Sequence, residues 1–231
     1  MDSYTQKQKE LVAKMKKMFA QNQHGSGTVV ERKDNYVDSE ELTLTTIVFI
    51  TKNIIDIIAQ KILEPLKSIE PDHYYYPAES THLTIKSIRY ASNPPGYTEQ
   101  DIEKVNNLFQ SIVSEFDSFT FSLEGLTRFP NSLSLMGYSN DSLKDLVLAL
   151  DQGLKDIGVP DNKKYFSDEI FFGNVTLCRF THDPGGKFLA KVKELEEVQI
   201  GELEIKELSL VTSDAVCSSA SKKIINTYNL K

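Results

Sequence analysis

The sequence predicts an α+β fold in which two similar lobes share one cleft. The order strand–helix–strand–helix–strand, inferred from the spacing of apolar residues, occurs twice along the chain. The tetrapeptide HLTI at 82–85 also returns as NVTL at 174–177, 92 residues later. Because both tetrapeptides lie in the same strand of their half, the repeat indicates two lobes related by a pseudo-two-fold axis.

The first half contains three predicted strands with alternating, β-branched residues and two helices with apolar residues on one face. In order, they are strand 42–50, helix 53–68, strand 81–88, helix 98–116 and strand 119–126. At the start of the first helix, Asn53 is a candidate N-cap. Pro65 is expected to bend or end the same helix, because proline has no backbone N–H.

The second half repeats this order, after a break expected at Arg128-Phe129-Pro130-Asn131. Its predicted elements are strand 132–138, helix 141–157, strand 171–180, helix 185–196 and strand 199–211. The alternation of the last strand changes phase near Glu207, which favours a β-bulge there.

These elements predict a domain over 41–231 with lobes at about 41–127 and 128–231, between which strands can be exchanged. Residues 1–40 are predicted to form an N-terminal helix and a linker. The helix carries Leu11, Met15, Met18 and Phe19 at helical spacing. We expect it to pack on the body of the protein; the alternative is a helix that binds a partner or a membrane surface.

Charge and composition exclude several classes of protein. The net charge is -7, although residues 1–33 alone are basic. An acidic body disfavours a long nucleic-acid track but leaves room for a local phosphate pocket. No apolar stretch approaches the roughly 20 residues of a membrane-spanning helix, and no secretory signal is recognised. With only two cysteines, the chain is expected in the reducing cytoplasm.

Alternation in the two repeated strands predicts a polar site. His82, Thr84 and Lys86 would share one face of the first strand, and Asn174 and Thr176 one face of the second. Hydroxyl and ammonium groups donate hydrogen bonds to phosphate oxygens. A histidine with a pKa near 6.5 can also transfer a proton at neutral pH.

The doubled H-x-T-(apolar) pattern resembles the two-histidine phosphoesterase superfamily, in particular its RNA ligase/cyclic phosphodiesterase (LigT-like) branch. The resemblance runs over most of 42–228 and includes YYYP at 74–77, FPN at 129–131, NVTLCR at 174–179 and LSLVTS at 208–213. It implies a bilobal fold with two antiparallel sheets around a central cleft, and action on 2′,5′ linkages or cyclic phosphodiesters, generally without a metal. The catalytic positions it implies are His82, Thr84, Asn174 and Thr176, and the substrate-binding positions are Lys86, Arg179, Tyr76 and Phe129.

The resemblance also implies a monomer that needs no cofactor and whose partner is a small phosphodiester, a nucleotide or an RNA end. However, Asn174 stands where the second histidine is expected, and asparagine cannot exchange a proton at neutral pH. The arginines that often follow the FPN segment are also missing, since Ser132-Leu133-Ser134 follow. Three readings remain open: an enzyme with weakened or altered activity, an inactive nucleotide- or RNA-end-binding protein, and a structural relative that binds a partner through its N-terminal helix.

Other candidate residues have two interpretations each. His182 precedes a turn and either folds back to replace the missing imidazole or lies in a solvated loop. His73, beside three tyrosines, either helps to stack a base or packs on the sheet. Cys178 has no base beside it in the sequence and is expected to be a small buried residue. No cysteine–histidine spacing typical of zinc is present.

Overall fold

The structure is a computed structural model that describes residues 3–21, 23, 31–36 and 39–231. Much of the predicted linker up to residue 40 therefore lies outside the described residues. The helices are α1 Ser3–Ala20, α2 Lys52–Ile58, a π-helical turn Ala59–Leu63, α3 Glu64–Lys67, a 3-10 turn Ala78–Ser80, α4 Glu99–Val113, α5 Asp141–Asp156 and α6 Gly186–Glu194. The strands are β1 Leu42–Phe49, β2 Tyr74–Tyr75, β3 His82–Ser92, β4 Phe119–Phe129, β5 Ser132–Tyr138, β6 Gly173–Arg179, β7 Gln199–Ile205, β8 Glu207–Ser213 and β9 Lys223–Asn229.

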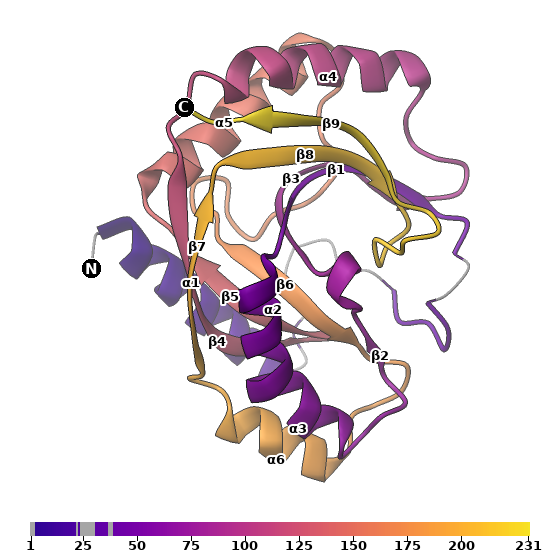
Figure 1. The fold of residues 1–231 in the computed structure, drawn as a ribbon, viewed down its shortest axis with the longest axis vertical. Helices are drawn as coiled ribbons and strands as arrows, with labels where there is room; N and C mark the ends of the chain where they lie inside the picture. The colour runs from indigo at the N-terminus through magenta and orange to yellow at the C-terminus, as the bar shows by residue number, and fades with distance from the viewer. Residues whose placement is uncertain (1–2, 22, 24–30, 37–38) are drawn as a thin grey trace.

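The strands form two antiparallel halves that meet at one junction. Their order is β7-β4-β5-β6-β3-β1-β8-β9, and β2 adds to β6. The junction is the β3–β6 pair, in which Leu83 lies opposite Val175. These two residues occupy equivalent positions of the repeated tetrapeptides, so the two copies meet at the centre of the sheet. Helices and antiparallel strands in this arrangement confirm the predicted α+β fold (Figure 1).

The halves of the sheet exchange strands along the sequence. Strands β8 and β9 complete the half that contains β1 and β3, whereas β4 pairs with β5 and β7. Residues 128–131, where a break between lobes was expected, belong instead to the β4–β5 hairpin, in which Phe129 pairs with Ser132. The single strand predicted over 199–211 was also wrong. It is two strands, β7 and β8, and the phase change marks the point where the chain crosses from one half to the other.

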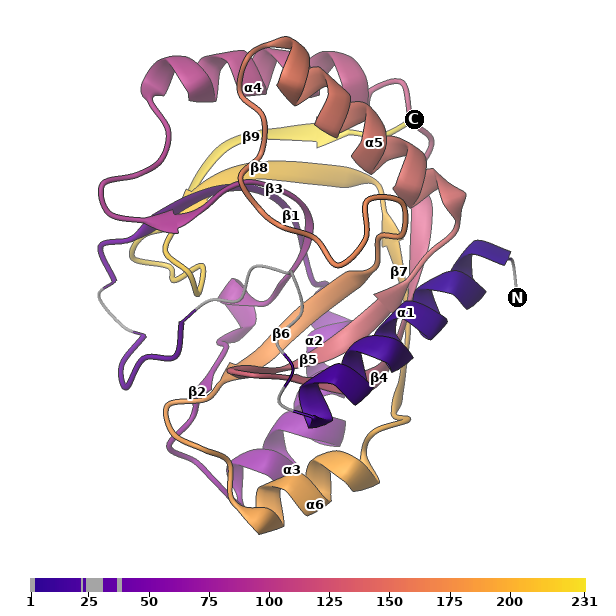
Figure 2. The same cartoon turned by 180° about the vertical axis from the view of Figure 1, so that it is seen from behind.

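Helices cover the outer surfaces of both halves. Helices α4 and α5 contact each other, α4 packs against β9 and α5 against β3, whereas α2 packs against β7 and α3 against α6 (Figures 1 and 2). Thr98 caps α4 in a reciprocal pair with Asp101. The cap predicted at Asn53 was wrong, because α2 already begins at Lys52 after Thr51. Pro65 does not end the helical segment; it follows a π-helical turn and lies in the first turn of α3, where its missing N–H is tolerated.

Helix α1 packs on the body of the protein, as expected, along β4 and β5 (Figure 2). Its buried side chains are Tyr4, Gln8, Val12, Met15 and Phe19. Gln8 is satisfied at both ends: its Nε2 donates to the Phe171 carbonyl, and its Oε1 accepts from the Ser139 N–H at 3.0 Å. Among the described residues, no helix combines the length and apolar character that crossing a membrane requires.

Candidate active site

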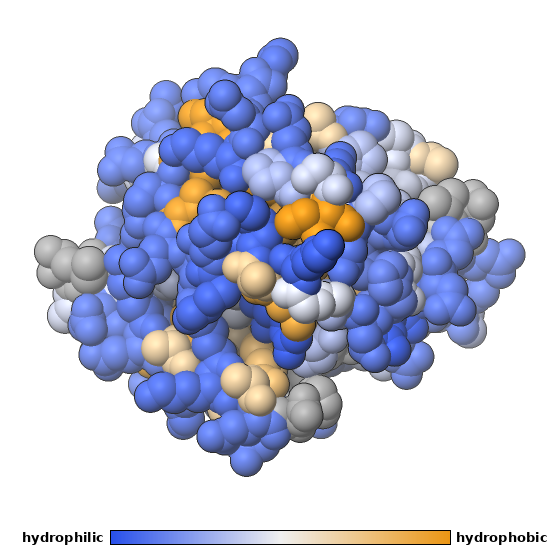
Figure 3. Space-filling view, turned by 90° about the horizontal axis from the view of Figure 1, so that it is seen from below, coloured by the Kyte–Doolittle hydropathy of each residue, from blue (hydrophilic) through white to orange (hydrophobic). Residues whose placement is uncertain are grey.

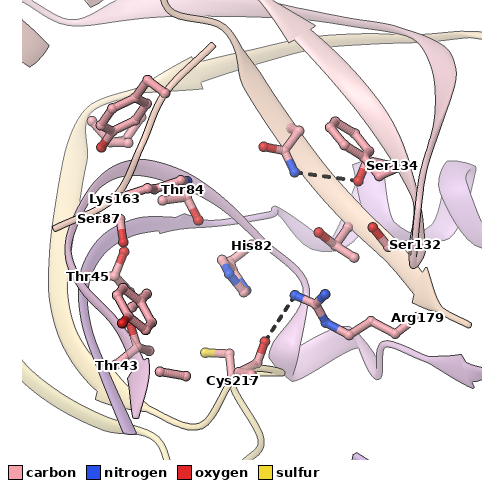
Figure 4. A pocket seen from close by; sticks show the side chains of 18 of the residues that line it. Thr43, Thr45, His82, Thr84, Ser87, Ser132, Ser134, Lys163, Arg179 and Cys217 are labelled. Carbon is pink, nitrogen blue, oxygen red and sulfur yellow. Dashed lines mark hydrogen bonds between the residues drawn. The ribbon is translucent and has the colours of Figure 1, made fainter. Parts of the chain in front are cut away.

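A cavity of about 260 Å³ lies where the two halves of the sheet meet. One wall comes from β1 and β3, the other from β5 and β6, and the loop 160–172 adds a third side. Seven of the residues predicted for the site line this cavity: Tyr76, His82, Thr84, Phe129, Asn174, Thr176 and Arg179. The structure therefore brings together polar side chains from both copies of the tetrapeptide (Figure 4).

The imidazole of His82 points into the cavity as a neutral base (Figure 4). Its Nδ1 lies 2.7 Å from the Ser80 carbonyl oxygen, which can only accept, so Nδ1 carries the proton and donates it. Nε2 is then left with a free lone pair. Burial, the largest cause, acts together with the positive charges of Arg179 and Lys222 against the raising effect of the Ser80 hydrogen bond, and the pKa of His82 is lowered to about 4.

Asn174 lies on the facing strand of the same cavity, at the position equivalent to His82. Continuing the register from the Leu83–Val175 pair places Asn174 level with Thr84, and His82 level with Thr176. The Asn174 amide donates a long hydrogen bond of 3.5 Å to the Ser134 hydroxyl. Of these two equivalent positions, one therefore holds a group that can take up a proton, His82, and the other holds an amide that can only form hydrogen bonds.

Three cationic side chains border the cavity: Arg179, Lys163 and Lys164. Arg179, at the end of β6, is buried, and its Nε donates to the Tyr76 hydroxyl at 3.0 Å, while its Nη2 donates to the Ala215 carbonyl at 3.3 Å. Lys163, from the loop 160–172, lines the same cavity (Figure 4). Burial, together with the charge of Lys86, lowers the pKa of Lys163 to about 8. These cations make the cavity suitable for an anion, although the chain as a whole is acidic.

Sequence reasoning missed Lys163 and its neighbours in the loop. The segment KKYF at 163–166 combines two basic and two aromatic residues between α5 and β6, and all four line the cavity. This run was the available signal, since basic and aromatic side chains together are typical of nucleotide-binding surfaces. Its relevance depends on the loop folding back over the sheet, which local spacing does not indicate.

Lys86 lies outside the cavity, contrary to the face predicted for it. The β1–β3 register pairs Ile47 with Thr84 but Thr46 with Lys86, so Ile85 is an extra residue and the alternation changes phase. Ser87 lines the cavity in place of Lys86. Lys86 is only 1% exposed to solvent. Its ammonium group forms ion pairs with Asp151, at 3.0 Å, and with Asp161.

The remaining candidates also lie elsewhere. His182 does not fold back into the cavity, because its ring packs on that of His73 with centroids 4.4 Å apart and neither residue lines the cavity. His73 is buried among aromatic side chains and is not placed to stack a base in the cavity. Cys178 is buried, and burial raises the pKa of its thiol to about 12, so it is not a nucleophile at neutral pH.

Two antiparallel halves that meet at a doubled tetrapeptide, with a cavity over the junction, define the LigT-like two-histidine phosphoesterase fold, and the chain has this fold. It is similar to TT0787 of Thermus thermophilus, with a TM-score of 0.58 and 16% identity over 81% of this chain and 97% of that one. E. coli LigT in its apo form matches with a TM-score of 0.55 and 16% identity over 84% and 99% of the two chains.

A crystal structure described as a phosphoesterase matches with a TM-score of 0.58 and 14% identity, over 83% of this chain and 99% of that one. LigT has also been crystallised with phosphate and with 3′-AMP. No protein-family model matches the chain, and no curated protein matches it by sequence.

Proposed function

We propose that the chain is a LigT-like phosphodiesterase of weakened activity, which binds a small nucleotide or an RNA end and acts on its phosphodiester through a single acid–base residue, His82. The observation that carries this proposal is the position of His82 and Asn174 in one cavity, at equivalent points of the repeat. His82 supplies a base, and an amide side chain, Asn174, stands at the equivalent position where a second histidine is expected.

Phosphate binding follows from the donors around His82. Arg179 and Lys163 supply positive charge, and Thr84 and Thr176 supply hydroxyl donors from the two facing strands. Charge-assisted hydrogen bonds of this kind are roughly twice as strong as neutral ones. That LigT is known with phosphate and with 3′-AMP supports a phosphate-bearing ligand in the same fold.

Aromatic side chains border the same cavity and suit a nucleobase. Phe129 comes from β4, and Tyr165, Phe166 and Phe171 come from the loop 160–172. Stacking of a base on an aromatic ring contributes about 1–3 kcal/mol and does not depend strongly on which base is present. We therefore expect a nucleotide to bind more tightly than inorganic phosphate.

Turnover would begin at His82. In hydrolysis of a 2′,3′-cyclic phosphodiester, its Nε2 would accept a proton from water as the water oxygen attacks phosphorus. The P–O bond to one ribose oxygen then breaks, and that oxygen needs a proton. Asn174 can donate a hydrogen bond to the leaving oxygen but cannot give up a proton, so that oxygen takes its proton from solvent water, and the proton held by His82 later returns to solvent. General acid catalysis contributes about 10²–10⁴-fold to the rate. We therefore expect turnover to be lower by this factor than in the same site with a histidine at position 174.

The alternative is a protein that binds nucleotides or RNA ends without turnover. The same missing proton donor favours it, and both functions require the same phosphate pocket. We place either function in the cytoplasm, in keeping with two free, buried cysteines, and we expect a monomer.

The test compares hydrolysis of 2′,3′-cyclic nucleotides by the wild type, His82→Ala and Asn174→His, with nucleotide binding measured in parallel. We expect weak wild-type turnover that His82→Ala abolishes and Asn174→His raises by about 10²–10⁴-fold. If the wild type shows no turnover and only Asn174→His hydrolyses the substrate, the wild-type protein is a binding protein without catalytic activity. If Asn174→His gains nothing and no nucleotide binds, the cavity is not a phosphodiester site.

A further inference from the structure

Three metal-ligating side chains gather outside the cavity, at the end of the molecule where α3, β2 and α6 meet. Glu70 and His73 lie between α3 and β2, and His182 lies between β6 and α6. Their ligating atoms all lie within 4.8 Å of one another. The surface at this end is mostly hydrophilic, with small separate apolar patches (Figure 3).

The Glu70 carboxylate is held in place by one of its two oxygens. Its Oε1 accepts a hydrogen bond from the Gly185 N–H at 2.7 Å. A side chain at position 185 would prevent this approach, since a Cβ there would lie 2.5 Å from Oε1. The other oxygen, Oε2, is turned toward His73 and lies 3.0 Å from its Nε2.

Thr181 determines which imidazole nitrogens carry protons. Its hydroxyl donates its only proton to the Asp72 carbonyl at 3.1 Å. The same oxygen can therefore only accept from the Nδ1 atoms of His73 and His182, which lie at 3.5 Å and 3.0 Å. Both rings then keep a lone pair on Nε2. Metal-ligating histidines are oriented in this way, with the non-ligating nitrogen donating to an oxygen.

Glu70 Oε2 and His73 Nε2 lack a suitable partner. Both atoms are buried, and although the distance between them fits an ion pair, neither has a hydrogen bond of acceptable geometry among the described residues. Two lone pairs 3.0 Å apart repel each other unless a cation lies between them.

We propose that Glu70, His73 and His182 bind a divalent metal ion of the zinc class, with a fourth position open to water. Two imidazoles and one carboxylate are a donor set that Zn²⁺ accepts, with bonds of about 2.0–2.2 Å. Such bonds place neighbouring ligand atoms about 3.4 Å apart on a tetrahedral ion. The Glu70–His73 distance is already close to this value, and the exposed His182 can rotate to complete the site.

The proposed ion would join two segments that lead to the cavity. Residues 70–73 run directly into β2 and then to Tyr76, and residues 181–185 follow Arg179 after the single residue Phe180. Tyr76 and Arg179 are hydrogen-bonded to each other at the cavity wall. A metal ion bound here would therefore hold the outer ends of β2 and β6 together, at a place outside the cavity itself.

The experiment titrates Zn²⁺ into the untagged full chain in competition with a chromophoric chelator, and measures thermal unfolding alongside. We expect one ion per chain and a rise in Tm of about 5–10 °C at a hundredfold excess over Kd. Glu70→Gln and His182→Asn should abolish binding at these concentrations, and Thr181→Val should weaken it about 10–100-fold. His82→Asn, which removes a histidine of the cavity, is the matched control and should bind Zn²⁺ as the wild type does.

Circular dichroism checks that each variant is folded, and the exposed position of His182 makes His182→Asn the variant least able to disturb the fold. The proposal is overturned if the folded wild type takes up no Zn²⁺, or if both ligand variants bind it as the wild type does. It is also overturned if His82→Asn removes the binding, because the ion would then lie in the cavity.

Discussion

His82 should make the folded chain sensitive to acid. Burial lowers the pKa of the folded-state ring to about 4, whereas an unfolded chain returns it to about 6.5. Between these values the unfolded chain binds a proton that the folded chain does not, so stability falls as the pH falls through this window. At about 1.36 kcal/mol for each pH unit, we expect roughly 2 kcal/mol of unfolding free energy to be lost between about pH 7 and pH 4.5.

Urea unfolding of the wild type and of His82→Asn at both pH values measures this loss. The two proteins share every other acid-sensitive group, so the change in their stability difference isolates His82. The difference should move in favour of the variant by roughly 2 kcal/mol on acidification. A difference that is the same at both pH values, or a His82 ring that titrates near 6.5 by proton NMR, would refute the burial argument and its neutral base.

Three further substitutions test other contacts. Lys86→Met leaves Asp151 and Asp161 without their shared cation and should lower the unfolding free energy, measured in urea, by about 3 kcal/mol. The affinity for phosphate should not change. A large loss of phosphate affinity would mean that Lys86 contacts the ligand. Arg179→Gln should weaken the binding of inorganic phosphate, measured by calorimetry, about tenfold or more, because a hydrogen bond from a charged donor contributes about 1.5–3 kcal/mol. An unchanged affinity would contradict the assignment of the cavity as a phosphate site. Thr98→Ala should cost about 1 kcal/mol of stability by removing the α4 capping box, and an unchanged urea midpoint would argue against that cap.

Most elements could be predicted because their signals are local. Periodicity located α4, and alternation located β1, β3 and β5. The repeated tetrapeptide carried more information, since its two copies meet at the β3–β6 junction and both line the cavity. A duplication therefore indicated a long-range contact that no single segment contains.

The errors arose where the answer depends on distant partners. Strands β7 and β8 follow each other almost without a break but pair with different halves of the sheet, which a continuous apolar pattern does not reveal. The single extra residue at Ile85 moves Lys86 away from the cavity, and a one-residue bulge has no reliable signature in the sequence. The edge strand β9, largely exposed and weakly apolar, was missed for the same reason.

The way α1 packs has a consequence for the order of folding during synthesis. Phe19 contacts the rings of Phe129 and Phe166, and Tyr4 and Gln8 contact the backbone at Phe171, so α1 supports three residues of the cavity wall. Helix α1 leaves the ribosome long before β4 and the loop 160–172 have been made. The contacts of α1 with the loop 160–172 can therefore form only after about 150 further residues have been synthesised, and until then the apolar face of α1 lacks these partners. The aromatic wall of the cavity is completed only after that.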